Sequence, residues 1–393
     1  FGIDFGFLNN RVNGSLEVYW NTTKDLLMAV PVDNTTGYSY QFQNFGKTSN
    51  RGIELSVNVD VINKGDFRFN VGAIYNYNRN KLDELPNADQ YLYSSYWGSS
   101  SLVPTNDYMF VEGKAIGLVR GFISEGYYTV DDFNYTNGQY VLKEGVPDIT
   151  KALTATYMHP YDLPAGQTAF PGAAKFRDVD ESGTVDLDDA TCLGEVMPRH
   201  TGSFQLNFNY KNFDLSTNFN WTAGGKVYNV AAMINASGQE FDGIGAQRAS
   251  WVADAFKVYN VNAAGDLYAV TNPDELRALN ANAKYHLPYH QSGITSSEWL
   301  ENGSYLRLQT LTLGYTLPKN WLTKVHVDKI RLYLTATNLF TITGYSGIDP
   351  EVNANPTGQS GFYSDLRIFP TLNMDFGTYP RARTFTFGAN ITF

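Results

Sequence analysis

One acidic segment of this sequence has side chains whose types and spacing suit metal binding. Residues 178–189 read Asp-Val-Asp-Glu-Ser-Gly-Thr-Val-Asp-Leu-Asp-Asp. In the ligand order of an EF-hand loop, positions one, three, five, seven, nine and twelve fall on Asp178, Asp180, Ser182, the Thr184 carbonyl, Asp186 and Asp189. Gly183 allows the sharp bend that such a loop needs. Hard oxygen ligands at this spacing suit Ca²⁺, and Mg²⁺ less well.

Two features depart from the EF-hand pattern. Position twelve is Asp rather than the longer Glu, and no helical pattern precedes the loop. The alternative is an acidic, solvated turn on an exposed loop. Because like charges packed this closely repel unless a cation holds them, we expect a bare calcium loop with a structural role, which stiffens a long connection.

Aromatic residues form the second group with a chemical use. Tyr96 and Trp97 follow Tyr91 and Tyr93 in one polar stretch, and flat rings of this kind stack on sugars. They are therefore the candidate substrate-binding residues. The competing interpretation, which we favour, is ordinary loop packing or a membrane-interface girdle, both of which are also rich in Tyr and Trp. Catalytic constellations are not found, and we expect no enzymatic activity.

The elements that must position these residues are strands of alternating character. From Thr384 to Phe393 every second residue is Phe, Ala or Ile, and the residues between them are Thr, Gly or Asn. Three hairpins repeat the pattern, with turns near Asn9-Asn10-Arg11, Asn63-Lys64-Gly65-Asp66 and Lys211-Asn212. Polar faces this long are too hydrophilic for a packed interior. The alternation therefore predicts an all-β, antiparallel transmembrane β-barrel with lipid outside and water inside.

Composition narrows the class further. Charged residues make up only 17% of the 393 residues and aromatic residues 15%, and the net charge of −10 argues against a nucleic-acid partner. No apolar run reaches the roughly 18 residues that a spanning helix needs. The strand pattern begins at Phe1 without an initiator Met or a signal segment, so we expect the carboxyl-terminal part of a longer protein.

Connections alternate between very short and very long. The long ones are about 81–105, 126–200, 222–303 and 341–381. Outer-membrane barrels show this asymmetry, with short periplasmic turns and long extracellular loops. If the chain ends in the periplasm, the strand at 67–80 runs outward and the strand at 201–210 runs inward. An even number of strands must therefore lie between them. We expect 106–125 to supply two of them, turning near Glu112-Gly113-Lys114, for about eleven strands in all.

Several stretches together resemble the SusC/RagA family of TonB-dependent outer-membrane importers of Bacteroidetes. They are FGIDFGFLNNRVNGSLEVYWNTTKDLLMAVPV at 1–32, SNRGIELSVNVDV at 49–61, EGKAIGLVRGF at 112–122, KFRDVDESGTVDLDD at 175–189, NGSYLRLQTLTLGYTLP at 302–318, NLFTITGYSGIDPEV at 338–352 and YPRARTFTFGANITF at 379–393. The resemblance covers nearly the whole chain. It also supports the calcium loop, because members usually carry an Asp/Asn-Gly-rich loop at this place.

The resemblance implies that residues 1–393 form half of a 22-stranded barrel, without the plug domain and the TonB box. It implies active import of oligosaccharide or peptide through the outer membrane of a Gram-negative bacterium. The implied partners are a SusD-like surface lipoprotein, TonB, and membrane lipid or lipopolysaccharide. Two alternatives remain: a passive porin or surface adhesin of barrel type, and a soluble all-β glycan-binding or hydrolase module. The soluble module requires a second protein layer over the apolar strand faces.

Overall fold

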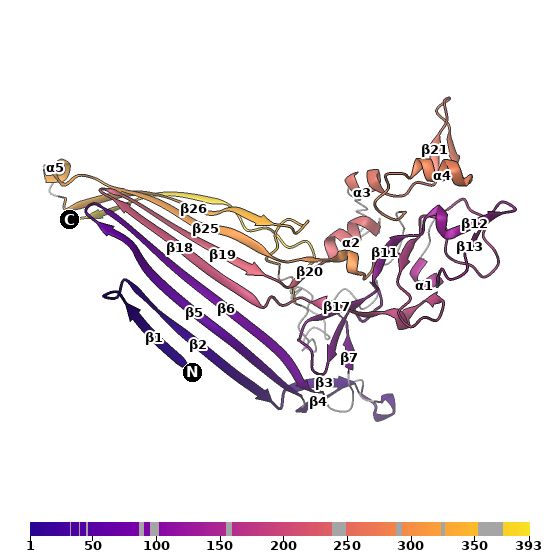
Figure 1. Ribbon diagram of the computed structural model, residues 1–393, viewed down its shortest axis with the longest axis horizontal. Coiled ribbons are helices and arrows are strands. Elements are labelled where there is room, and N and C mark those ends of the chain that lie inside the picture. Colours follow the sequence, from indigo (N-terminus) through magenta and orange to yellow (C-terminus); the bar gives the residue numbers. More distant parts are fainter. Residues whose placement is uncertain are drawn as a thin grey trace.

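One antiparallel sheet of nine long strands dominates the structure. The computed structural model describes residues 1–31, 33–38, 40–44, 46–85, 90–94, 102–154, 159–237, 249–287, 293–323, 327–352 and 372–393. In spatial order the nine strands are β1 (Gly2–Phe7), β2 (Val12–Lys24), β5 (Lys47–Lys64), β6 (Phe67–Glu84), β18 (His200–Tyr210), β19 (Phe213–Ala223), β25 (Tyr305–Thr316), β26 (Lys329–Thr343) and β28 (Thr384–Thr392). Each of these nine strands pairs with the one that follows it in this order, and Figure 1 shows them as one curved layer.

The register places like residues in rows across this sheet. One apolar row crosses six strands through Phe69, Phe208, Leu215, Leu313, Leu334 and Phe387. The adjacent polar row runs through Asn70, Asn207, Ser216, Thr312, Thr335 and Thr386. Because side chains alternate across a strand, the two rows face opposite sides of the sheet. The predicted alternation is therefore confirmed as a two-faced wall.

No second layer of protein covers the apolar face within the described part of the chain. Phe387 is 73% exposed, and Leu313 and Leu334 are each more than 40% exposed. The clusters of buried apolar side chains lie in the long connections, and Leu82 at the end of β6 is the one described barrel-strand residue that joins them. This single-layer arrangement excludes the soluble sandwich, which needs a facing sheet over the same rows.

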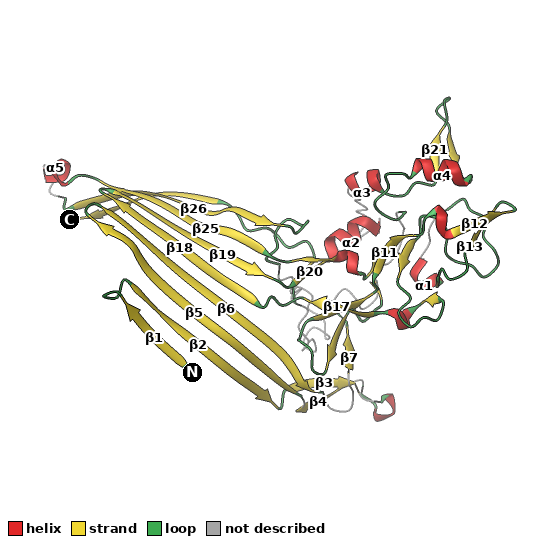
Figure 2. Ribbon diagram, viewed as in Figure 1, coloured by secondary structure: helices red, strands yellow, loops and turns green. Residues whose placement is uncertain are grey.

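The connections differ sharply between the two ends of the sheet. At one end the turns are short: Leu8, Asn9 and Asn10 adopt positive φ between β1 and β2, and Lys211 does so between β18 and β19. At the other end the long connections form a separate body of small sheets and short helices, which we call the loop body (Figure 2). The expected asymmetry is confirmed.

Among the described residues the wall has nine strands, and the two that we expected at 106–125 are not part of it. Residues 106–125 do form two strands that turn at Glu112-Gly113-Lys114, β9 (Tyr108–Val111) and β10 (Leu118–Gly121). They belong to a four-stranded sheet with β7 (Gln90–Tyr93) and β17 (Thr191–Glu195), and β6 pairs directly with β18. Four-residue strands are too short to cross a bilayer, which takes about 9–11 residues. The requirement for an even number of wall strands between β6 and β18 still holds, because that number is zero.

The remaining described strands are short and lie outside the wall. They are β3 (Leu27–Pro31), β4 (Tyr40–Asn44), β8 (Leu102–Val103), β11 (Ser124–Tyr127), β12 (Phe133–Thr136), β13 (Gln139–Leu142), β14 (Asp148–Ile149), β15 (Ala174–Phe176), β16 (Thr184–Val185), β20 (Lys226–Asn229), β21 (Tyr259–Val261), β22 (Leu267–Ala269), β23 (Gly293–Ile294), β24 (Leu300–Asn302) and β27 (Met374–Asp375). The α-helices are α1 (Lys151–Thr154), α2 (Val230–Ser237), α3 (Ala249–Asp254), α4 (Pro273–Leu279) and α5 (Lys319–Leu322). Apart from α5, which lies near the carboxyl terminus, the helices lie in the loop body (Figure 1).

Candidate functional site

The predicted metal loop follows β15 in the loop body and ends with the 3₁₀ turn Leu187–Asp189. Carboxylate oxygens of Asp178, Asp180 and Asp189 lie within 4.8 Å of one another. Gly183 has φ +87°, so the bend expected at this glycine is present. The fold thus brings together positions one, three and twelve of the predicted ligand set.

Backbone N–H groups hold these carboxylates in place. Asp189 is fully buried and accepts from the amides of Val179 at 2.5 Å and Asp186 at 2.7 Å. Asp178 accepts from the amide of Gly183 at 2.7 Å. Hydrogen bonding from Ser182, whose amide donates to Asp180 at 3.0 Å, is the main reason that the pKa of Asp180 falls below its usual range. Three converging carboxylates are the hard oxygen donors that Ca²⁺ takes.

The other three predicted ligands bond within the loop itself. Asp186 caps the 3₁₀ turn by accepting from the amide of Asp188 at 2.8 Å. The Ser182 hydroxyl donates to the Thr184 carbonyl at 3.0 Å. Metal binding through all six residues would therefore require these local bonds to exchange for metal ligands, and the metal itself stays a prediction.

The loop aromatics that the structure describes are mostly packing residues. Tyr93 and Tyr128 are buried, and Tyr128 donates to the carbonyl of Pro147 at 2.7 Å. Tyr96 and Trp97, the predicted substrate-binding residues, lie outside the described residues and stay a prediction. Tyr135 is exposed and lines a hollow of about 460 Å³ at the tip of the loop body, together with Asn134, Lys143 and Arg277.

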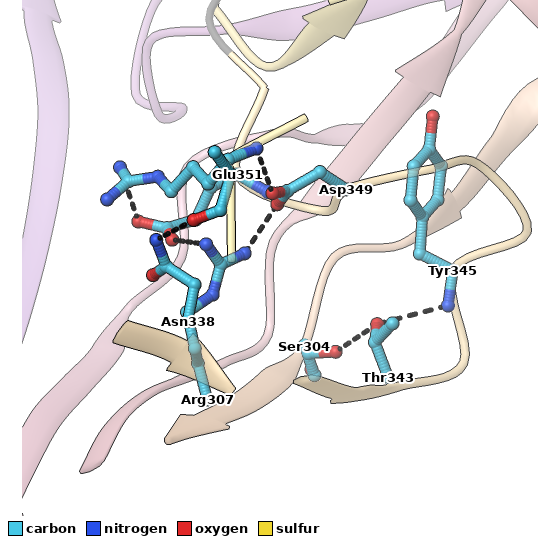
Figure 3. Close-up of polar contacts among 9 residues, drawn as sticks. Ser304, Arg307, Asn338, Thr343, Tyr345, Asp349 and Glu351 are labelled. Atoms are coloured by element: carbon cyan, nitrogen blue, oxygen red, sulfur yellow. Dashed lines mark hydrogen bonds and ion pairs between the residues drawn. The ribbon is translucent and has the colours of Figure 1, made fainter. Parts of the chain in front are cut away.

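A buried ion-pair network ties the last long connection to the polar face of the wall (Figure 3). Arg307 of β25 is 2% exposed, and its guanidinium lies 2.5 Å from Asp349 and 3.0 Å from Glu351. Arg381, at the far end of the same connection, pairs with Glu351 at 3.1 Å. Arg307 therefore holds the first part of the connection between β26 and β28 directly, and Glu351 links it to the far end at Arg381.

Neighbouring bonds extend this anchor. The Thr343 hydroxyl donates to the carbonyl of Ser304 at 2.8 Å, and the amide of Tyr345 donates to the Thr343 hydroxyl (Figure 3). The Tyr345 hydroxyl donates to Asp375 at 2.6 Å. Sequence reasoning missed this site. The available signal was an isolated Arg at an inward position of an otherwise Leu- and Thr-rich strand, which requires a buried counterion.

A half-buried acid in the loop body, Glu298, gives a pH-dependent prediction. Burial raises the pKa of Glu298 from 4.5 to about 7. Because the pKa of Glu298 is higher in the folded state than in the unfolded state, its protonated form favours folding. This contribution to stability is complete below pH 4.5 and is lost as the pH rises through 7. We expect local stability around 295–302 to fall by up to about 3 kcal/mol over this range. Urea titration of the full-length protein at several pH values, followed by limited proteolysis, measures it. Glu298→Gln should remove the pH slope, and an unchanged slope would contradict the prediction.

The geometry of the wall and its connections defines the class of protein. A single-layered antiparallel wall, apolar on one face and polar on the other, with short turns at one end and a folded loop body at the other, is an outer-membrane β-barrel wall. None of the helices in the described residues has the length and apolar character required to cross a bilayer.

The chain belongs to the TonB dependent receptor-like, beta-barrel family, whose model matches residues 1–339. It is similar to TonB-dependent receptor P3 of Formosa agariphila, with 30% identity over 393 residues, all of this chain and 33% of that protein. TonB-dependent receptor SusC of Bacteroides thetaiotaomicron is 26% identical over 402 residues, which is all of this chain and 31% of that protein. The chain thus spans about a third of the length of these curated relatives.

Solved structures agree with this fold. The structure of the RagAB peptide transporter matches all of this chain and 34% of its own, with a TM-score of 0.66 and 21% identity. The RagAB peptide importer in the open-open state matches with a TM-score of 0.65 and 21% identity, over all of this chain and 34% of its own. Together with the family match, these findings confirm the predicted resemblance, the barrel fold and the outer-membrane location. The relatives are named as receptors, in agreement with the expectation that the protein is not an enzyme.

Proposed function

We propose that this chain is part of the barrel wall of an active importer that takes up oligosaccharide or peptide with a SusD-like surface lipoprotein. The observation that carries the proposal is the folded loop body at one end of the wall. Twenty buried apolar residues, among them Phe122, Tyr128 and Phe170, form one of its cores. A core of this size makes the loops a rigid platform, which suits a docking lipoprotein. Coupling to TonB would pass through segments outside this chain.

The surface of the loop body has groups that suit both glycan and peptide. The hollow beside Tyr135 combines one exposed ring with amide, ammonium and guanidinium donors. Rings stack on sugars, and the same donors bind peptide carbonyls. Relatives named SusC and RagAB support the importer class, and the RagAB name refers to peptide for that protein.

Uptake by cells that carry the full-length receptor tests the proposal. Fluorescent oligosaccharides and peptides should enter cells with the intact receptor. Uptake should stop when the TonB-coupling segment is deleted or a protonophore is added, and the lipoprotein should co-purify with the receptor. Uptake at the same rate after the deletion would instead identify a passive porin. A receptor that admits neither solute but mediates attachment would identify an adhesin.

As part of the proposal, the loop at 178–189 binds Ca²⁺ and stiffens the loop body. Asp178, Asp180 and Asp189 fit the ion, because their oxygens already converge. At a Ca²⁺ concentration one hundred times its Kd, binding should suppress local opening by about 2.7 kcal/mol, or roughly 100-fold. Limited proteolysis of the full-length receptor should then show slower cleavage within 160–200 with Ca²⁺ than with chelator.

Two matched variants sharpen that test. Asp178→Asn removes one converging carboxylate and should abolish the protection by Ca²⁺. Asp188→Asn changes an acid of the same loop that lies outside the cluster, and it should keep the protection. Equal cleavage of the unmodified protein with and without Ca²⁺ would end the metal proposal.

A further inference from the structure

An aromatic belt marks one border of the apolar face. Tyr75 stacks on Trp221 with ring centroids 6.1 Å apart, and its hydroxyl lies 2.8 Å from Nδ1 of His200. Tyr77 lies 5.1 Å from the same histidine ring. The opposite border has its own aromatic pairs at the short-turn end, Phe67 with Tyr210 and Phe213 with Tyr315. About ten residues of β6 separate the two belts, which is the length of one bilayer crossing.

Cations follow immediately beyond the belt at the loop end. Arg79 is the next residue of β6 on the face of Tyr75 and Tyr77, roughly 7 Å farther along the strand. Arg51 of β5 lies directly opposite Arg79, and its guanidinium stacks 3.8 Å above the centroid of Trp20. Like charges placed directly opposite each other on one sheet face are destabilising unless an anion lies between or beside them.

A cavity of about 290 Å³ opens beside these residues, where β6 and β18 diverge into the long connection. It is lined by four cationic side chains and one acidic one: Arg79, Lys81, Lys114, Arg199 and Glu195. The polypeptide reaches it from three segments, β6, the turn at Glu112-Gly113-Lys114 and the residues before β18. The two strands that diverge there, β6 and β18, lie side by side in the middle of the strand order, away from the edge strands β1 and β28 (Figure 1).

Two of these cations already have carboxylate partners. Arg199 pairs with Glu195 at 2.6 Å, and Lys81 lies 3.3 Å from Asp83. Arg79 and Lys114 form no ion pair with a carboxylate of the described chain. The cavity therefore keeps positive charge unbalanced, although the whole chain carries a net charge of −10.

We propose that this cavity binds the phosphate group of an outer-leaflet lipid. The aromatic belt and the apolar rows below it would contact the acyl chains, which places a phosphorylated headgroup at the level of Arg79. The guanidinium of Arg79 can donate two parallel hydrogen bonds to phosphate, and Lys114 adds a point charge. Binding would also relieve the repulsion between Arg79 and Arg51. This lipid site is independent of the solute that the barrel imports.

Titration of the full-length receptor in detergent, followed by native mass spectrometry, tests the site with three probes. These are bisphosphorylated lipid A, the same lipid after dephosphorylation, and inorganic phosphate. The bisphosphorylated lipid should bind at least tenfold more tightly than the dephosphorylated lipid, a difference of about 1.4 kcal/mol. Millimolar inorganic phosphate should not displace it, because the acyl contacts are part of the site.

The double variant Arg79→Gln/Lys114→Gln should lose the tenfold preference for the phosphorylated lipid. Lys64→Gln, an exposed lysine at the opposite end of β5, is the matched control and should keep it. Heat-modifiable migration in gels shows whether each variant is folded, so a loss of binding by a folded variant supports the site. Equal binding of both lipids by the unmodified protein, or full displacement by inorganic phosphate, would overturn the proposal.

Discussion

Replacing Arg307 with Ala should destabilise the connection between β26 and β28 by about 3–5 kcal/mol, because it removes one partner of a buried ion pair. Asp349 would keep hydrogen bonds from the amides of Glu351 and Arg381 but lose its cationic partner. Glu351 would keep its ion pair with Arg381 but lose the one with Arg307. Hydrogen exchange of the full-length receptor should therefore show much faster exchange at 345–352, while amides of the wall itself change little.

Two controls separate this effect from a general loss of charge. Arg177→Ala breaks an exposed pair with Glu125 and should cost less than about 1 kcal/mol. Arg307→Lys retains the charge without the planar fork, so it should give an intermediate loss. Unchanged exchange at 345–352 in Arg307→Ala would show that the network does not anchor the connection.

Placing an arginine at Phe219 should cost up to about 2–4 kcal/mol, because this side chain faces the hydrocarbon between the two aromatic belts. Phe219 stacks on Phe204 with ring centroids 4.6 Å apart, and on β19 it lies between Phe213 of the short-turn belt and Trp221 of the loop-end belt, nearer to Trp221. Phe208 lies as close to Tyr210 of the short-turn belt as Phe219 lies to Trp221, so Phe208→Arg should have a cost of similar size. Urea unfolding and refolding of the full-length protein in lipid vesicles measures both.

Asn207→Arg provides the matched control on the polar face. Asn207 lies opposite Ser216 and Asn70, and a charge there enters water. Its cost should stay within about 0.5 kcal/mol, as at other solvated positions. Equal costs at Phe219 and Asn207 would mean that both faces meet the same medium.

The wall could be predicted because its determinants are local and periodic. Alternation along each strand and Asn- or Gly-containing turns identified all nine barrel strands. The error at 106–125 has a physical cause. Tyr108, Met109 and Phe110 are buried in succession, so both faces of β9 meet protein, and such short apolar runs do not differ in sequence from a weak membrane strand. The small hairpin of β3 and β4 was also not predicted.

The candidate sites also differ in whether their residues are close together in the sequence. The acidic loop gathers three carboxylates from twelve consecutive residues, so spacing alone indicated it. The anchor joins Arg307 to Asp349, Glu351 and Arg381, and the cationic cavity joins β6 to residues near 114 and 199. The cationic cavity depends on the pairing of β6 with β18, and the anchor depends on the return of a long connection to the wall. A single sequence does not contain that information in its local pattern.

Spin-label scanning along β18 and β19 of the full-length receptor in bilayers tests the central claim most directly. With Cys192 replaced by Ser, single cysteines would be introduced from Phe204 to Asn209 and from Asp214 to Phe219 to carry the label. Collision with oxygen, which concentrates in lipid, should peak at Phe204, Leu206 and Phe208. Collision with a water-soluble nickel reagent should peak at Gln205, Asn207 and Asn209, in strict alternation. Labels that meet neither reagent at the Phe and Leu positions would show a facing layer of protein and would contradict the barrel.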